Sequence, residues 1–91
     1  MMKIPKQLKI GGHTYKIKEV ENGELNDEAN CGVVLREKGI ILIDKKLIAS
    51  EKEETLFHEI LHVLNGELVE TDVDWLAQGI YAVLKNNNLL R

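Results

Sequence analysis

Two histidines four residues apart, with a glutamate directly after the first, are the residues of this chain best suited to carry chemistry. They are His58, Glu59 and His62 in the segment HEILH. In a helix, positions 58 and 62 are separated by roughly 40° and one turn, so both imidazoles can reach one ion on the same side. Zinc accepts neutral imidazole nitrogens, and a glutamate that is not itself a ligand can take a proton from the attacking water. The spacing therefore predicts zinc ligands at His58 and His62 and a general base at Glu59.

The same five letters also fit an ordinary amphipathic helix in which the two histidines and the glutamate are polar surface residues. Three features favour the metal site over this alternative. The motif lies inside a segment with helix start and stop signals, the segment is otherwise almost wholly apolar from residue 56 to 64, and further acidic residues follow it. We therefore prefer the metal interpretation.

The helix that carries the motif is predicted over residues 51–65. Ser50 followed by Glu53 matches a capping box, and Asn65-Gly66 is a stop signal. A broad apolar stripe predicts that this helix packs on a sheet, and the residues that form it are Leu56, Phe57, Ile60, Leu61, Val63 and Leu64.

A second helix is predicted over residues 71–86, where Thr71 with Asp74 also fits a capping box. Tyr81 is expected to lie in the core and Trp75 to be a packing or edge residue. The apolar residues at helical spacing are Val73, Leu76, Ala77, Ile80 and Leu84.

Two β-hairpins are predicted ahead of the helices. The first covers residues 7–20 around the Gly11-Gly12 pair, residues 21–30 form a loop, and the second has strands at 33–35 and 40–43 joined by a turn over 36–39. Strands followed by helices indicate an α+β fold, with a small twisted antiparallel sheet of two hairpins followed by two helices.

Composition is that of a single globular domain spanning residues 1–91. Hydrophobic residues make up 44% and charged residues 30% of the chain, and the formal net charge is −3 with the lysines dispersed. We therefore expect neither a nucleic-acid nor a membrane partner. Cys31 is the single cysteine, and the N-terminus lacks the apolar core of a signal peptide, so we expect a cytoplasmic protein. The sequence does not indicate an oligomeric state.

The segments TLFHEILHVL and ETDVDWLAQGIYAVL resemble the zincin metallopeptidases of gluzincin type, and most closely the small phage-like ImmA/IrrE-like members. The likeness covers residues 33–86. It implies a zincin-like fold with a twisted antiparallel sheet under an active-site helix, and a substrate extended along the sheet edge.

The resemblance also implies a third zinc ligand at Glu70, beside His58 and His62, with Glu59 as the general base. Leu68 stands where the metzincin motif has a histidine. Only seven residues separate His62 from Glu70, so a tight turn at Gly66 must return the chain quickly.

Asp72 and Asp74 stay open as alternative third ligands, because an aspartate can also complete a zinc site. All three acids also suit the N-terminal turn of a helix, whose dipole favours negative charge.

The leading interpretation is a zinc-dependent peptidase that hydrolyses a protein or peptide substrate, in which Glu59 accepts a proton from water and returns it to the leaving amine. Two alternatives stay open. One is a non-catalytic domain that zinc stabilises, and the other is a phage-type accessory protein that acts by binding a host factor.

Overall fold

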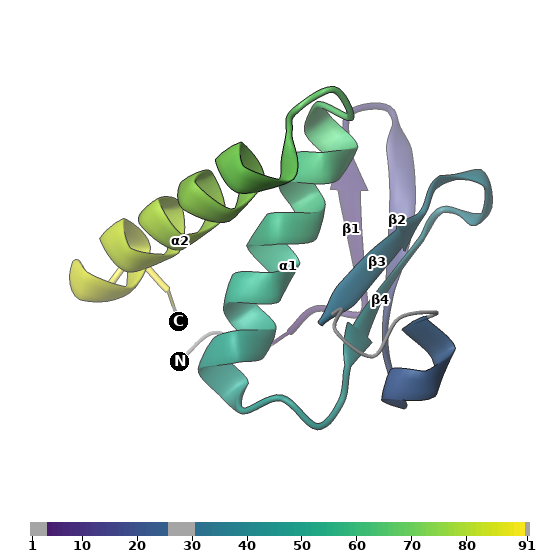
Figure 1. Cartoon of the computed structure of the whole chain (residues 1–91), viewed down its shortest axis with the longest axis horizontal. Helices are drawn as coiled ribbons and strands as arrows, with labels where there is room; N and C mark the ends of the chain where they lie inside the picture. The colour runs from purple at the N-terminus through teal and green to yellow at the C-terminus, as the bar shows by residue number, and fades with distance from the viewer. Residues whose placement is uncertain (1–3, 26–30, 91) are drawn as a thin grey trace.

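Four strands precede two helices along the chain, as expected for an α+β fold (Figure 1). The computed structural model describes residues 4–25 and 31–90. The strands and helices, with two short 3₁₀ helices η1 and η2, are β1 (Gln7–Ile10), β2 (His13–Val20), η1 (Asn22–Leu25), β3 (Gly32–Leu35), η2 (Arg36–Lys38), β4 (Ile40–Asp44), α1 (Ala49–Leu64) and α2 (Glu70–Asn86). The predicted loop 21–30 thus contains η1, and its residues 26–30 lie outside the described part of the chain.

The four strands form one mixed sheet in the order β1-β2-β4-β3. Both predicted hairpins are present, since β1 pairs antiparallel with β2 and β3 pairs antiparallel with β4. The prediction of a wholly antiparallel sheet is wrong, because β2 and β4 pair in parallel. The second hairpin places its more apolar strand, β4, in the centre, where four of its five residues are buried. Less buried β3 therefore takes the edge.

Helix α1 lies across one face of this sheet. Gly32 allows a close approach at the edge, because a Cβ atom there would lie 2.8 Å from Cγ2 of Thr55 and 2.9 Å from the carbonyl oxygen of Leu42. The helix thereby packs directly against β3 and β4. The buried residues of the core between sheet and helix are Tyr15, Ile17, Ile41, Ile43 and Leu56.

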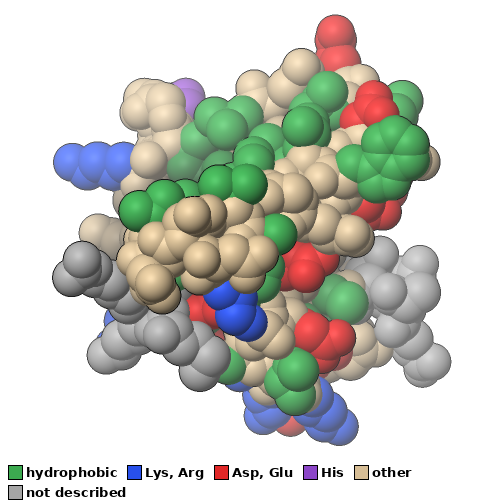
Figure 2. Space-filling view, turned by 90° about the vertical axis from the view of Figure 1, so that its left-hand side faces the viewer, with side chains coloured by type: hydrophobic (Ala, Val, Ile, Leu, Met, Phe, Trp, Pro, Cys, Tyr) green, Lys and Arg blue, Asp and Glu red, His purple; other side chains and the backbone are tan. Residues whose placement is uncertain are grey.

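Helix α2 packs against α1 and projects away from the sheet (Figure 1). It buries Val73, Ala77 and Tyr81. Leu76 and Ile80, which have the same helical spacing, are instead exposed. Figure 2 shows hydrophobic side chains on the side of the molecule toward which α2 projects. The helix carries two apolar faces, and α1 covers one of them.

The two predicted capping boxes are wrong. Helix α1 begins at Ala49 and α2 at Glu70, so Ser50 and Thr71 lie inside the helices. In the part of the chain that the structure describes, neither N-cap residue forms a side-chain cap. The acids assigned to these boxes make tertiary contacts instead. Glu53 is 2% exposed and accepts a hydrogen bond of 2.6 Å from the Tyr81 hydroxyl, and Asp74 faces a histidine of α1.

No helix in the described part of the chain is both long and apolar enough to cross a membrane.

Candidate metal centre

The two histidines of the HEILH segment lie one turn apart on α1 and point the same way. Their Nε2 atoms are 3.1 Å apart, and both side chains are partly buried. The hydrophobic neighbours of the motif face the sheet, which turns the two imidazoles toward the start of α2. Helical spacing alone therefore brings His58 and His62 together, as predicted.

Glu70, the first residue of α2, completes a group of three potential ligands. Its Oε1 atom lies 2.7 Å from Nε2 of His58, and its Oε2 atom lies 3.2 Å from Nε2 of His62. One ligand atom from each residue falls within a cluster no wider than 4.8 Å. Among the described residues, these three are the group of histidine, cysteine and acidic side chains able to hold one ion.

A compact turn after α1 explains how Glu70 reaches the histidines. The backbone N–H of Asn65 bonds to the carbonyl of Leu61, and the Oδ1 atom of Asn65 accepts a hydrogen bond of 3.0 Å from the N–H of Glu67. An asparagine side chain that bonds two residues ahead stabilises a reversal of the chain. The tight turn predicted around Gly66 is thus confirmed.

Asp74 occupies the other side of His58. Its Oδ1 atom lies 3.0 Å from Nδ1 of that ring. A carboxylate at Nδ1 favours the tautomer that carries its proton there, so the Nε2 lone pair of His58 is free to face an ion. Asp72 is exposed and, within the described residues, forms no hydrogen bond or ion pair with either histidine. The geometry therefore favours Glu70 over both aspartates as third ligand.

Glu59 is the most buried acid of the group, with 5% of its surface exposed. Its Oε2 atom is 4.0 Å from Nε2 of His58. Burial raises the pKa of the Glu59 carboxyl to about 7, against the opposing effect of His58, and the negative charge of Glu70 raises it further. A carboxyl group with a pKa near neutrality can both accept and return a proton under ordinary conditions.

The donor set fits zinc. Two imidazole nitrogens and one carboxylate form a common protein site for this ion, and ligand atoms around a tetrahedral zinc lie roughly 3.3 Å from one another. The distances between the histidine nitrogens, and from them to the Glu70 oxygens, range from 2.7 to 3.4 Å. Three protein ligands leave one coordination position for water or substrate.

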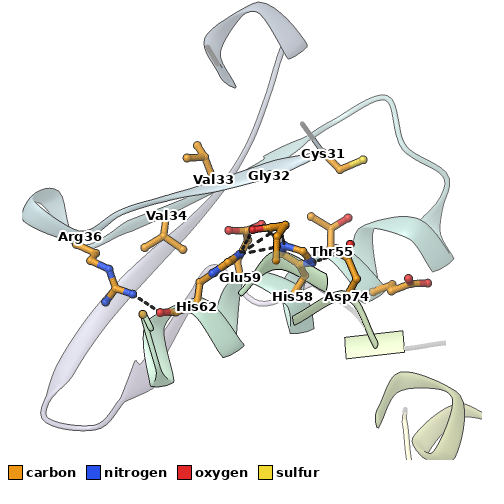
Figure 3. A pocket seen from close by; sticks show the side chains of 13 residues that line it. Cys31, Gly32, Val33, Val34, Arg36, Thr55, His58, Glu59, His62 and Asp74 are labelled. Atoms are coloured by element: carbon orange, nitrogen blue, oxygen red, sulfur yellow. Dashed lines mark hydrogen bonds and ion pairs between the residues drawn. The ribbon is translucent and has the colours of Figure 1, made fainter. Parts of the chain in front are cut away.

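These groups line a pocket of about 680 Å³ between β3, α1 and the start of α2. Figure 3 shows β3 along one side, the histidines and Glu59 in the middle, Arg36 at one end, and Cys31 and Thr55 at the other. The third histidine of the chain, His13, is exposed at the start of β2 and does not line this pocket.

Two residues of the pocket have roles that the sequence did not indicate. From the sequence, Asp74 is an alternative ligand or a capping residue, although its spacing of four residues from Glu70 places both on one helix face. Arg36 donates a hydrogen bond from its guanidinium group to the backbone carbonyl of His62. Its place at the pocket depends on how the second hairpin packs, so no local pattern signals it.

Comparisons with protein-family models, with curated proteins and with solved structures give no match to this chain. The assignment of a function therefore depends on the residues of the pocket.

Proposed function

We propose that this chain is a zinc-dependent metallopeptidase of the zincin type, acting on a peptide or protein. The observation that carries the proposal is the convergence of His58, His62 and Glu70 on one point, with the buried carboxyl of Glu59 beside it. Ligands alone would support any zinc site. A buried glutamate beside such a group, and not part of it, supports hydrolysis in particular.

Zinc bound by the three ligands would lower the pKa of a coordinated water to near 7 and polarise the carbonyl group of the substrate. Glu59 accepts the proton as water attacks the carbonyl carbon, and then delivers it to the leaving amine. Asp74 holds the His58 ring in the orientation and tautomer that binding needs, through Nδ1. Glu59, Glu70 and Asp74, the three acids around the two histidines, thus each have a task.

We propose that the backbone of the substrate binds along the edge strand β3. This strand stands last in the sheet order, and its residues 32–34 line the pocket opposite α1. An extended peptide can add to a free strand edge through main-chain hydrogen bonds, which fix its direction and register. A peptide bound in this way would lie across the histidines and Glu59.

The substitution Glu59→Gln tests the catalytic part of the proposal. The amide keeps the shape of the side chain but cannot take a proton from water, so we expect zinc content and folding to be retained. Hydrolysis should fall by at least about 100-fold, the usual contribution of a general base.

The assay compares the wild-type protein and Glu59→Gln at equal zinc content, measured by mass spectrometry of the metal. Both are incubated with a digested proteome, and new termini are identified by peptide mass spectrometry. If the two proteins cleave an identified substrate at equal rates, Glu59 is not the base.

A second candidate is a non-catalytic domain in which zinc ties α2 to α1. The observation that favours it is the position of α2, which packs on α1 through one side while its neighbouring apolar residues Leu76 and Ile80 are exposed. A metal held by residues of both helices would stabilise this arrangement. One zinc per chain, with a clear rise of the unfolding temperature on zinc binding and no cleavage in the proteome screen, would select this candidate.

A further inference from the structure

The charges that line the pocket are of two kinds. Glu59, Glu70 and Asp74 surround the histidines and belong to the metal centre. The two other charged side chains of the lining are Arg36 and Glu54, and within the described residues neither forms an ion pair. The pocket thus presents one positive and one negative group that the proposed chemistry does not use.

These two charges stand at opposite ends of the pocket. Arg36 is fixed at the end of His62, because its guanidinium group donates to the His62 carbonyl and lies against Gly66. Glu54 precedes His58 by one turn of α1 and is adjacent to Thr55, which Figure 3 places at the end away from Arg36. The metal centre therefore lies between a cationic and an anionic end.

The guanidinium group of Arg36 can bind a ligand in addition to the His62 carbonyl. A guanidinium group carries five N–H donors in a planar fork, and the bond to His62 uses one side of it. The side chain is exposed, so the remaining donors are accessible from the pocket. A carboxylate is the partner that this fork matches best, because it can accept two parallel hydrogen bonds.

The separation of the two ends fits a short peptide. Residues 54 and 62 are about 12 Å apart along a helix axis. An extended chain advances about 3.3 Å per residue, so the two ends are about three or four peptide residues apart.

We propose that the pocket selects peptides of dipolar character, with an acidic side chain bound by Arg36 at the His62 end and a basic side chain facing Glu54 at the opposite end. This inference rests on the proposed function, because the two selected side chains are assigned to opposite sides of the peptide bond to be cleaved. Arg36 is the residue expected to determine specificity for the acidic position.

The test uses a library of randomised nonapeptides and the zinc-loaded protein. Cleaved products are sequenced by mass spectrometry, and the enrichment of Glu over Gln is measured at each position around the cut. We expect a preference for Glu at one position on the order of three- to tenfold, the range of a charge-assisted hydrogen bond at an exposed site. Raised salt should weaken the preference.

Arg36→Glu should replace this preference with one for Lys at the same position, and Arg36→Ala should reduce the ratio of Glu to Gln to about one. Lys38→Glu is the matched control, because it makes the same change of charge as Arg36→Glu. Lys38 is exposed on the same 3₁₀ helix and does not line the pocket. Glu54→Gln should remove a preference for Lys on the other side of the cut. A ratio measured within one protein does not depend on the fraction that is folded.

Binding separates this inference from the proposed function. The same library is captured on immobilised, zinc-loaded Glu59→Gln, which cannot turn peptides over, and the bound pool is sequenced. Cleavage without any charge preference would overturn the inference and leave the peptidase standing. A charge preference in binding that Arg36→Glu reverses, with no cleavage by the wild-type protein, would support the inference and contradict the peptidase. If the library is neither bound nor cleaved, both are wrong.

Discussion

At the scale of single residues, the proposed metal centre assigns different tasks to the same functional group at Glu70 and Asp74. Glu70 directs its carboxylate at the Nε2 atoms of both histidines, and Asp74 directs its own at Nδ1 of His58. One helical turn of α2 separates them. The first is placed to bind an ion, and the second to orient a ligand.

Replacing Glu70 should therefore damage zinc binding far more than replacing the neighbouring Asp72. Glu70→Gln removes a charged ligand, and we expect the zinc affinity to fall by roughly 100-fold or more, whereas Asp72→Asn should change it little. Competition with a chromophoric chelator gives both affinities. A larger loss with Asp72→Asn would place the third ligand elsewhere on α2.

Asp74→Asn should lower the zinc affinity by roughly 10- to 100-fold, the usual effect of removing a carboxylate that holds a histidine ligand. The asparagine side chain has the same shape as aspartate but is a weaker acceptor for the hydrogen bond from the Nδ1–H group of His58. The same competition titration measures the zinc affinity of this variant. If Asp74→Asn is more damaging than Glu70→Gln, an aspartate is the ligand and the gluzincin-type assignment is wrong.

The sequence gives more information about the local residues of the site than about the distant ones. His58 and His62 are brought together by helical periodicity, which acts here over a spacing of four residues. The position of Glu70 could be predicted from a local sequence pattern and a tight turn, because Glu70 lies within a dozen residues of both histidines. Arg36 enters from a hairpin far along the chain, and only the packing of β3 against α1 brings it there.

At the scale of elements, both hairpins and both helices could be predicted, with helix ends correct to within two residues. The order of strands could not, because alternation of apolar residues does not show which strand of the second hairpin takes the central place. The helix caps were predicted wrongly for a related reason. Glu53 and Asp74 have the local spacing of capping residues, but burial and the opposite helix give them other partners.

The contact of α1 with the sheet edge depends on Gly32. Gly32→Ala would place a Cβ atom against Thr55 and the Leu42 carbonyl, and that atom would also be 3.3 Å from Cγ of Glu59. Overpacking of this kind costs roughly 1–3 kcal/mol of the free energy of unfolding. Urea denaturation measures it.

Gly12→Ala is the matched control, because a Cβ atom there meets no atom of the described residues within 4 Å. Equal stability of the two variants would show that α1 does not need the close approach at Gly32.

At the scale of the whole molecule, a buried hydrogen bond links α2 to α1. The Tyr81 hydroxyl donates to Oε1 of Glu53, and among the described residues the Oε2 atom of Glu53 has no hydrogen-bond partner. Both side chains are almost fully buried. Tyr81→Phe would leave the Glu53 carboxyl without its donor, and should lower the free energy of unfolding by roughly 1–3 kcal/mol.

The same pair predicts how stability depends on alkaline pH. Burial, followed by the hydrogen bond to Glu53, raises the pKa of Tyr81 to about 12. Between the usual tyrosine pKa near 10 and this value, the unfolded chain loses a proton that the folded chain keeps, so stability falls as pH rises through this range. Below pH 10 the contribution is complete.

Urea unfolding of the metal-free protein from pH 9 to 12 measures this dependence. Tyr81→Phe should show a smaller decline over the same range, because it lacks the group. Equal slopes for the two proteins would contradict the assignment of the raised pKa to Tyr81.

The parallel pairing of β2 with β4 also bears on the order of events during folding. The two hairpins and the two helices form from contacts between near neighbours, but Lys16 and Ile40, which pair across the centre of the sheet, are far apart in sequence. Closing that long segment has an entropic cost that no local element offsets beforehand. The core beneath α1 includes Tyr15 and Ile17 of β2, so we expect the support under the helix that carries Glu59 and the histidines to be complete only after this pairing has formed.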